Sequence, residues 1–236
     1  MMSADSFDRA SLKEGLVAAW PVCLGYFAIG LALGVLAQKA GLAPWQIGLM
    51  SLLVYAGSSQ FIAVSMLAGG AGVAAVIFTT LIVNLRHLLM SSALSVHLKQ
   101  MDRRIMPLFA YGVTDESFAV NMTRFRQGDW DWQRSLWVNH TANLAWVLST
   151  ILGGVSGQFV PPGAFGLDFA LPAMFIGLLL FQLKSYEYVL VAIFAGMMAV
   201  LISLLTGGFL HILSGALLAT VAGVLARRRN LFGRGG

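Results

Sequence analysis

Long apolar runs dominate the chain and are separated by short polar connections. A helix needs about 20 mostly apolar residues to cross a hydrocarbon core of about 30 Å. By that rule the pattern predicts eight apolar segments, at roughly residues 15–38, 45–68, 71–95, 105–122, 133–156, 167–183, 187–205 and 208–226. These runs lack the period-two alternation of a strand-built barrel. The predicted fold is therefore an all-α polytopic membrane protein with a single transmembrane domain over 1–236.

Composition excludes a soluble domain. Hydrophobic residues make up 58% of the 236 and charged residues 11%, whereas a soluble domain carries about 25% charged residues. The chain has no GxxxxGK[ST] or HExxH motif and no Cys/His cluster, so we expect no enzyme, no metal and no cofactor. The net charge of +5 fits basic cytoplasmic anchors rather than a nucleic-acid partner.

Loop charges indicate which segments span the membrane, because Lys and Arg concentrate on the cytoplasmic side. We expect the tails at 1–14 and 227–236 to be cytoplasmic. Eight full crossings would then put four basic loop residues outside, namely Lys39, Lys99, Arg103 and Arg104. If the second and fourth segments enter and leave on one side, Lys39 alone stays outside. The charges favour the second arrangement, and eight full crossings remain the alternative.

The second and fourth segments also have polar interiors, AGSSQ at 56–60 and TDES at 114–117. Non-helical backbone at membrane depth is tolerated only where protein buries it or where it lines a cavity. We therefore expect these two segments to be broken or re-entrant and to mark a cavity.

Four ionisable residues interrupt the third and fourth segments: Arg86 and His87 in TLIVNLRHLLMSS, and Asp115 and Glu116 in YGVTDESFAVN. A charge at the centre of a spanning helix costs about 2.5–3.5 kcal/mol on insertion scales, so such residues are usually paired and functional. Consecutive helical residues point about 100° apart. We therefore expect Asp115 to pair with Arg86 and Glu116 to remain free to titrate. The alternative is a purely structural pair that pins the third segment against the fourth.

The fifth segment carries Asn139, His140 and Asn143 on one stripe about 100° wide, which predicts that this stripe faces polar groups. On the third segment, Asn84 shares a face with His87. Histidine titrates near physiological pH, so a histidine paired with a carboxylate could carry a proton. A role for His140 in packing alone remains open.

Three runs carry a family resemblance: VYAGSSQFIAVSMLAGGA at 54–71, TTLIVNLRHLLMSSALS at 79–95 and TDESFA at 114–119. In this order and spacing they resemble the AzlC family of branched-chain amino-acid permeases, and LPAMFIGLLLFQL at 171–183 fits a later segment of that family. The resemblance implies export of valine, leucine, isoleucine or analogues across a bacterial inner membrane. It also implies a small membrane partner of the AzlD type.

The expected mechanism is proton-coupled alternating access at a site near the bilayer midplane. Arg86 would bind the substrate carboxylate bidentately, and Asp115 or Glu116 the ammonium. The expected residues are Gly57, Ser58, Ser59, Gln60, Asn84 and Arg86 for substrate, His87, Asp115, Glu116 and His140 for proton coupling or the ion pair, and Asn139 and Asn143 as further polar lining.

Three other functions remain open on the residues alone. A passive channel would use the same charged site without coupling. A membrane enzyme would need an activated nucleophile, for which Ser58, Ser59 and Ser117 are the candidates. A scaffold subunit would only support its small partner.

Overall fold

The computed structural model describes residues 9–99, 101–161, 185–205 and 210–228, together with 166, 169, 173, 176, 177, 179, 180 and 183. All regular structure in these residues is helical, which confirms the all-α class. The chain divides into two compact units, residues 1–172 and 173–236. The segment expected at 167–183 falls mostly outside the described residues, so the count of eight segments stays a prediction, as does the single transmembrane domain.

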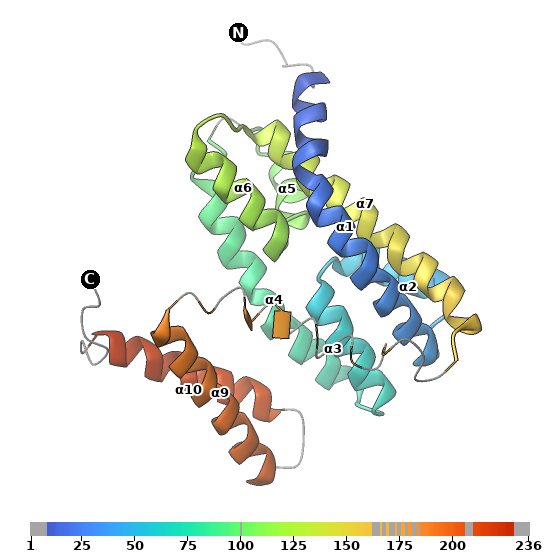
Figure 1. Ribbon diagram of the computed structural model, residues 1–236, viewed down its shortest axis with the longest axis vertical. Helices are drawn as coiled ribbons and strands as arrows, with labels where there is room; N and C mark the ends of the chain where they lie inside the picture. The colour runs from blue at the N-terminus through green and yellow to red at the C-terminus, as the bar shows by residue number, and fades with distance from the viewer. Residues whose placement is uncertain are drawn as a thin grey trace. The chain divides into compact units, whose positions relative to one another are not determined.

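The first unit contains α1 (Arg9–Lys39), α2 (Pro44–Val54), α3 (Gly57–Ala68), α4 (Val73–Ser95), α5 (Met106–Tyr111), α6 (Asp115–Gln127), α7 (Trp132–Ser156) and the 3₁₀ turn η1 (Gly157–Phe159) (Figure 1). The second unit contains α9 (Tyr186–Leu205) and α10 (Leu210–Arg228), which pack on each other. Within the described residues, α1, α4 and α9 are long and apolar enough to cross a membrane, and α2 and α3 are shorter apolar helices.

Helices α1 and α7 run parallel and in contact along their lengths (Figure 1). Glycines allow this close approach at both ends. A Cβ at Gly15 would lie 2.5 Å from Trp137 Cβ, and one at Gly34 would lie 2.2 Å from the Thr150 carbonyl oxygen. Small residues at helix contacts are the usual means of close packing between helices in membranes. This helix pair is the rigid frame of the first unit.

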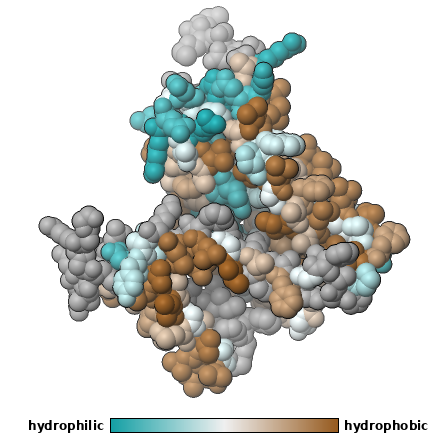
Figure 2. Space-filling model, viewed as in Figure 1, coloured by the Kyte–Doolittle hydropathy of each residue, from teal (hydrophilic) through white to brown (hydrophobic). Residues whose placement is uncertain are grey.

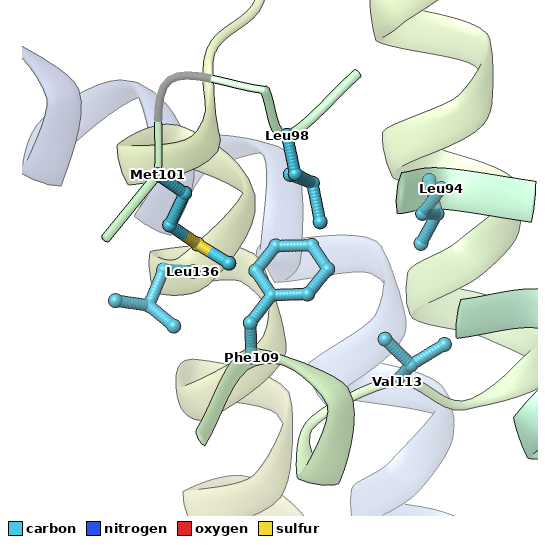
Figure 3. Packing of buried hydrophobic residues seen from close by; sticks show 6 residues of the cluster. All are labelled: Leu94, Leu98, Met101, Phe109, Val113 and Leu136. Carbon is cyan, nitrogen blue, oxygen red and sulfur yellow. The ribbon is translucent and has the colours of Figure 1, made fainter. Parts of the chain in front are cut away.

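Helix α4 runs antiparallel to α7, since Leu94 near its end packs in one apolar cluster with Leu136 near the start of α7. The cluster also contains Leu98, Met101, Phe109 and Val113. Figure 3 shows Leu98, Met101 and Leu136 gathered around the Phe109 ring. The cluster fixes α5 between the end of α4 and the start of α7.

The second and fourth segments are both interrupted, as predicted. The second breaks between α2 and α3 at residues 55–56, and the fourth between α5 and α6 at 112–114. Helix α2 begins, and helix α3 ends, at one end of the first unit. Helix α5 begins, and helix α6 ends, at the opposite end (Figure 1). His97 stacks on Phe125, with ring centroids 4.6 Å apart, which places the connection before α5 beside the end of α6. This geometry matches the arrangement that the loop charges favour.

Apolar side chains cover much of the exterior. Along α4, Leu88 and Leu89 are 65% and 71% exposed, and soluble monomers rarely expose large contiguous apolar surfaces. Figure 2 shows hydrophilic side chains gathered near the N-terminal end of α1 and the α6–α7 connection. There Arg134 pairs with Glu14 at 2.6 Å. We call this region, around the start of α1, the end of α6 and the start of α7, the polar end.

Candidate functional site

The break in the second segment is formed by Tyr55, which has a left-handed backbone conformation with φ 40° and ψ 53°. The end of a helix leaves its last carbonyl groups without intrahelical partners. One of them, the Leu52 carbonyl, accepts a hydrogen bond from the Tyr111 hydroxyl. Because Tyr111 is the last residue of α5, this bond ties the break in one interrupted segment to the break in the other.

Helix α3 begins directly after this break, at Gly57, and Ala56 gives it no side-chain cap. A Cβ at Gly57 would lie 3.1 Å from Trp146 Cη2, so glycine lets this first turn pack against α7. Ser58 and Ser59 follow and are buried, at 4% and 0% exposed. The first N–H groups of a helix have no intrahelical acceptor and form its positive end. An uncapped first turn in a buried position is a favourable place for an anionic group.

Helix α6 begins after the break in the fourth segment and is capped. Thr114 Oγ1 accepts a hydrogen bond from the Ser117 N–H at 3.3 Å, and Ser117 Oγ accepts one from the Thr114 N–H at 2.9 Å. Before the cap, a Cβ at Gly112 would lie 2.7 Å from Asn139 Cβ, so glycine lets the break approach α7. The cap directs Asp115 and Glu116 to the first turn of α6, where acidic side chains interact favourably with the helix dipole.

Arg86, near the middle of α4, joins the first turns of α3 and α6. One of its terminal nitrogens lies 2.6 Å from Asp115 Oδ2, and the other donates to Ser58 Oγ. The Arg86 and Asp115 side chains are 31% and 34% exposed. Ser59 donates a second bond from α3 to α4, to Asn84 Oδ1 at 2.5 Å. The expected ion pair is therefore present, and it connects both interrupted segments.

Glu116 faces a different partner, Tyr26 on α1. The Tyr26 hydroxyl donates to Glu116 Oε2 at 2.7 Å and lies 2.7 Å from Thr114 Oγ1. A phenol has one hydroxyl proton, so Thr114 donates to Tyr26 when Tyr26 donates to Glu116. Tyr26 is 5% exposed. Glu116 is thus hydrogen-bonded rather than isolated, but it makes no ion pair within the described part of the chain.

Gln60 lies in a separate buried network between α2, α3 and α7. Its Nε2 donates to Ser51 Oγ at 2.9 Å, and its Oε1 accepts from Trp146 Nε1 at 2.8 Å. Thr150 Oγ1 donates to Ser51 Oγ at 2.8 Å. Gln60 is 1% exposed and its amide is bonded at both atoms. In this conformation Gln60 links α2, α3 and α7 through both atoms of its amide.

The polar stripe on α7 faces the fourth predicted segment, which contains α5 and α6. Asn139 Oδ1 accepts from Asn121 Nδ2 at 2.9 Å, and Asn139 Nδ2 donates to the Phe109 carbonyl at 3.3 Å. Asn143 Nδ2 donates to the Tyr111 hydroxyl at 3.1 Å. The two asparagines of the stripe therefore meet polar partners as expected and position α5 and α6.

The two histidines are not joined to the acids. The His140 ring stacks on Tyr111, with centroids 6.4 Å apart, and the Nε2 atoms of His87 and His140 are buried without a partner among the residues described. Neither histidine makes a hydrogen bond or ion pair with Asp115 or Glu116 in those same residues. The described residues also contain no group of three or more His, Cys, Asp or Glu side chains that could hold a metal ion.

Sequence reasoning did not identify Tyr26, Ser51 and Thr150 as parts of these networks. Their signal is a hydroxyl group within an apolar helical run. That signal is weak, because such hydroxyls commonly bond to the carbonyl one turn earlier, as Thr80 and Ser92 do on α4.

The part of the chain that forms the candidate site is also the part that is similar to known proteins. The family model described as AzlC protein matches residues 21–160, which include every residue of the candidate site described in this section. The inner membrane protein YgaZ of Escherichia coli strain K12 is 30% identical over 75% of this chain and 76% of its own length. A membrane protein of Archaeoglobus fulgidus is 31% identical over 88% of this chain and 92% of its own length. The branched-chain amino acid transport protein AzlC of Bacillus subtilis strain 168 is 30% identical over 71% of this chain and 66% of its own length. No solved structure matches the chain.

Proposed function

This chain belongs to the AzlC protein family, and we propose that it is a secondary active transporter for the proton-coupled export of branched-chain amino acids. A relative of the chain carries the name branched-chain amino acid transport protein. We place the chain in a bacterial inner membrane with both termini in the cytoplasm. We also propose a small membrane subunit of the AzlD type as its partner.

The observation that carries the proposal is the position of Arg86 between two interrupted segments. It bonds Asp115 at the start of α6 and Ser58 at the start of α3. Interrupted helices whose ends meet near the bilayer midplane form the substrate sites of many secondary transporters. A charge within a spanning helix is unfavourable, and it usually has a functional role.

Arg86 is suited to the substrate carboxylate. A guanidinium presents parallel N–H groups that match a carboxylate, and the uncapped first turn of α3 adds its positive end beside Ser58. Because Asp115 already occupies one terminal nitrogen, the substrate carboxylate competes with Asp115. Binding of substrate would therefore loosen the connection between α4 and α6, and this loosening would be the first step of a change in access.

Glu116 is suited to the coupling step. The Glu116 carboxylate attracts the substrate ammonium when it is ionised. Protonation of Glu116 removes its charge and weakens that attraction. If loading of a proton releases the amino acid and loading of the amino acid releases a proton, the two are transported in exchange. The branched side chain would lie against apolar helix surface, where one methylene changes binding by only about 1–3 kcal/mol. We therefore expect overlapping affinities for valine, leucine and isoleucine.

The test is transport of labelled leucine from loaded lipid vesicles that contain this chain alone, the small subunit alone, or both. Export against a leucine gradient that requires an inward proton gradient supports the proposal. Leucine movement only down its own gradient, whatever the proton gradient, indicates a passive channel. Leucine binding and transport by the small subunit alone would reduce this chain to a scaffold.

A further inference from the structure

Tyr55 combines two unfavourable features at the centre of the site. Within the described residues it is the one non-glycine with a positive φ, at 40°. Bulky side chains rarely adopt this conformation, and strained backbone clusters at binding sites and switches.

The second feature is its hydroxyl group. Tyr55 is 1% exposed, and its hydroxyl makes no hydrogen bond of normal geometry among the described residues, although the side chains of Tyr26 and Thr114 lie close to it. The nearby hydroxyls of Tyr26 and Tyr111 are both bonded. A buried hydroxyl without a partner has lost its hydration without replacement, and native proteins rarely leave such groups unexplained.

The Tyr55 ring lies between these two tyrosines. It meets the Tyr26 ring edge-on with centroids 6.4 Å apart and the Tyr111 ring with centroids 5.9 Å apart. Tyr26 Oη is bonded to Glu116 Oε2, so Glu116 lies beside the pair of rings that Tyr26 and Tyr55 form. The second oxygen of Glu116 makes no hydrogen bond within the described ranges. Glu116 and Tyr55 are therefore both neighbours of Tyr26, Glu116 through the Tyr26 hydroxyl and Tyr55 through the Tyr26 ring.

We propose that Tyr55 and Glu116 together bind the substrate ammonium, through the Tyr55 hydroxyl oxygen and the second Glu116 oxygen. This inference rests on the proposed function and assigns the amino-group half of its site. An ammonium group has three N–H donors and no acceptor, so it suits a carboxylate and a phenol oxygen. Aromatic rings such as those of Tyr26 and Trp146, 5.1 Å apart, also favour a nearby cation. A substrate carboxylate would be repelled by Glu116 there, whereas Arg86 attracts it.

The experiment measures binding of L-leucine and of 4-methylpentanoate to the full-length chain in lipid nanodiscs. The second compound has the same carbon skeleton and carboxylate but no ammonium. In Tyr55→Phe we expect leucine affinity to fall about tenfold or more, as for the loss of a hydrogen bond to a charged group. Competition by 4-methylpentanoate should stay unchanged, and the thermal unfolding midpoint should not fall, because the deleted hydroxyl has no partner.

Tyr111→Phe is the matched control, since it deletes a phenol oxygen that donates to Leu52 and accepts from Asn143. Tyr111→Phe should lower the thermal unfolding midpoint. The ratio of the affinity for leucine to the affinity for 4-methylpentanoate should stay unchanged. Unchanged leucine affinity in Tyr55→Phe, or an equal loss for both compounds, would overturn the inference while the proposed function stands. Absence of leucine binding to the wild-type chain would overturn the inference together with the proposed function.

Discussion

Arg86 can release Asp115 without losing all of its polar surroundings, because Ser58 and the uncapped first turn of α3 stay beside it. Asp115 likewise keeps the N-terminal end of α6. A pair held in this way can separate at moderate cost, unlike a pair enclosed in hydrocarbon.

The first prediction concerns the shape of the Arg86 cation. Arg86→Lys keeps the charge but removes the planar fork that contacts Asp115 and Ser58 together. We expect leucine transport to fall about tenfold or more, as for the loss of one charged hydrogen bond, with near-normal insertion into the membrane. Arg124→Lys, at the polar end, is the matched control and should transport normally. Normal transport by Arg86→Lys at equal protein level would contradict a role in binding the carboxylate.

The second prediction separates the two adjacent acids. Asp115→Asn leaves Arg86 without its counter-charge, so we expect a lower yield of folded protein. The loss should be smaller than the about 3–5 kcal/mol of a fully buried pair, because Ser58 and the first turn of α3 stay beside Arg86. Glu116→Gln keeps an oxygen for the Tyr26 hydroxyl, so it should fold normally. It should bind leucine less tightly, because the charge that faces the ammonium is lost, and the export that remains should no longer depend on the proton gradient.

Yield, leucine exchange and gradient-driven export should be compared for both variants. If Glu116→Gln lowers the yield and Asp115→Asn abolishes coupling, the two roles are exchanged. If both variants keep full coupling, protons do not pass through this pair.

The Arg86–Asp115 pair was predictable because charges in apolar helices need partners and few were available. The bond from Tyr26 to Glu116 was not predictable. Helical periodicity shows which residues share a face of one helix, but the register between α1 and α6 depends on packing that periodicity does not contain. For the same reason, the sequence could not show that His87 and His140 lack a hydrogen bond to either acid in this conformation.

At the scale of elements, the interruptions matter more than the spanning helices. Their approximate locations were predictable from polar residues and from loop charge. Their details were not, because both breaks lack proline. The first depends on the backbone of Tyr55, and the second on the Thr114 cap and the close approach of Gly112 to Asn139. Such features become visible only when neighbouring helices are in place.

The third prediction tests α1 and α7 as a rigid frame. In Gly34→Ala the new methyl would lie 2.2 Å from the backbone oxygen of Thr150. Because that oxygen belongs to the backbone of α7, the overlap can be relieved only if α1 and α7 move apart. Forced overpacking typically costs about 1–3 kcal/mol. We therefore expect a clear fall in the thermal unfolding midpoint.

Gly25→Ala, on the same helix, is its matched control, since a Cβ at Gly25 has nothing within 4 Å. Alanine is a better helix former than glycine by about 1 kcal/mol, so the midpoint should stay or rise. Equal midpoints for the Gly34 and Gly25 variants would show that α1 and α7 do not pack as described.

At the scale of the first unit, two broken segments approach the middle from opposite ends, with α4 between their first turns (Figure 1). In the transporter we propose, each interrupted segment would open its own end of the site, while α1 and α7 would stay in place. Because Arg86 contacts both segments, opening of one end is linked to the contacts at the other. Alternating access requires that kind of linkage.

The fourth prediction places this arrangement in the membrane. On a Cys23→Ala background, single cysteines would replace Gly69, Lys99 and Gln127, which are all exposed. With the N-terminus in the cytoplasm, α1 crosses outward, the α2–α3 pair returns to the outside, and α4 crosses inward. An impermeant thiol reagent on whole cells should therefore label position 69. Positions 99 and 127 should react only after the cells are made permeable, because α5 begins and α6 ends on the cytoplasmic side.

Labelling of 99 but not 127 from outside would require the fourth segment to span the membrane fully and would contradict this topology. Labelling of both, with 69 protected, would reverse the orientation and keep the two re-entrant segments.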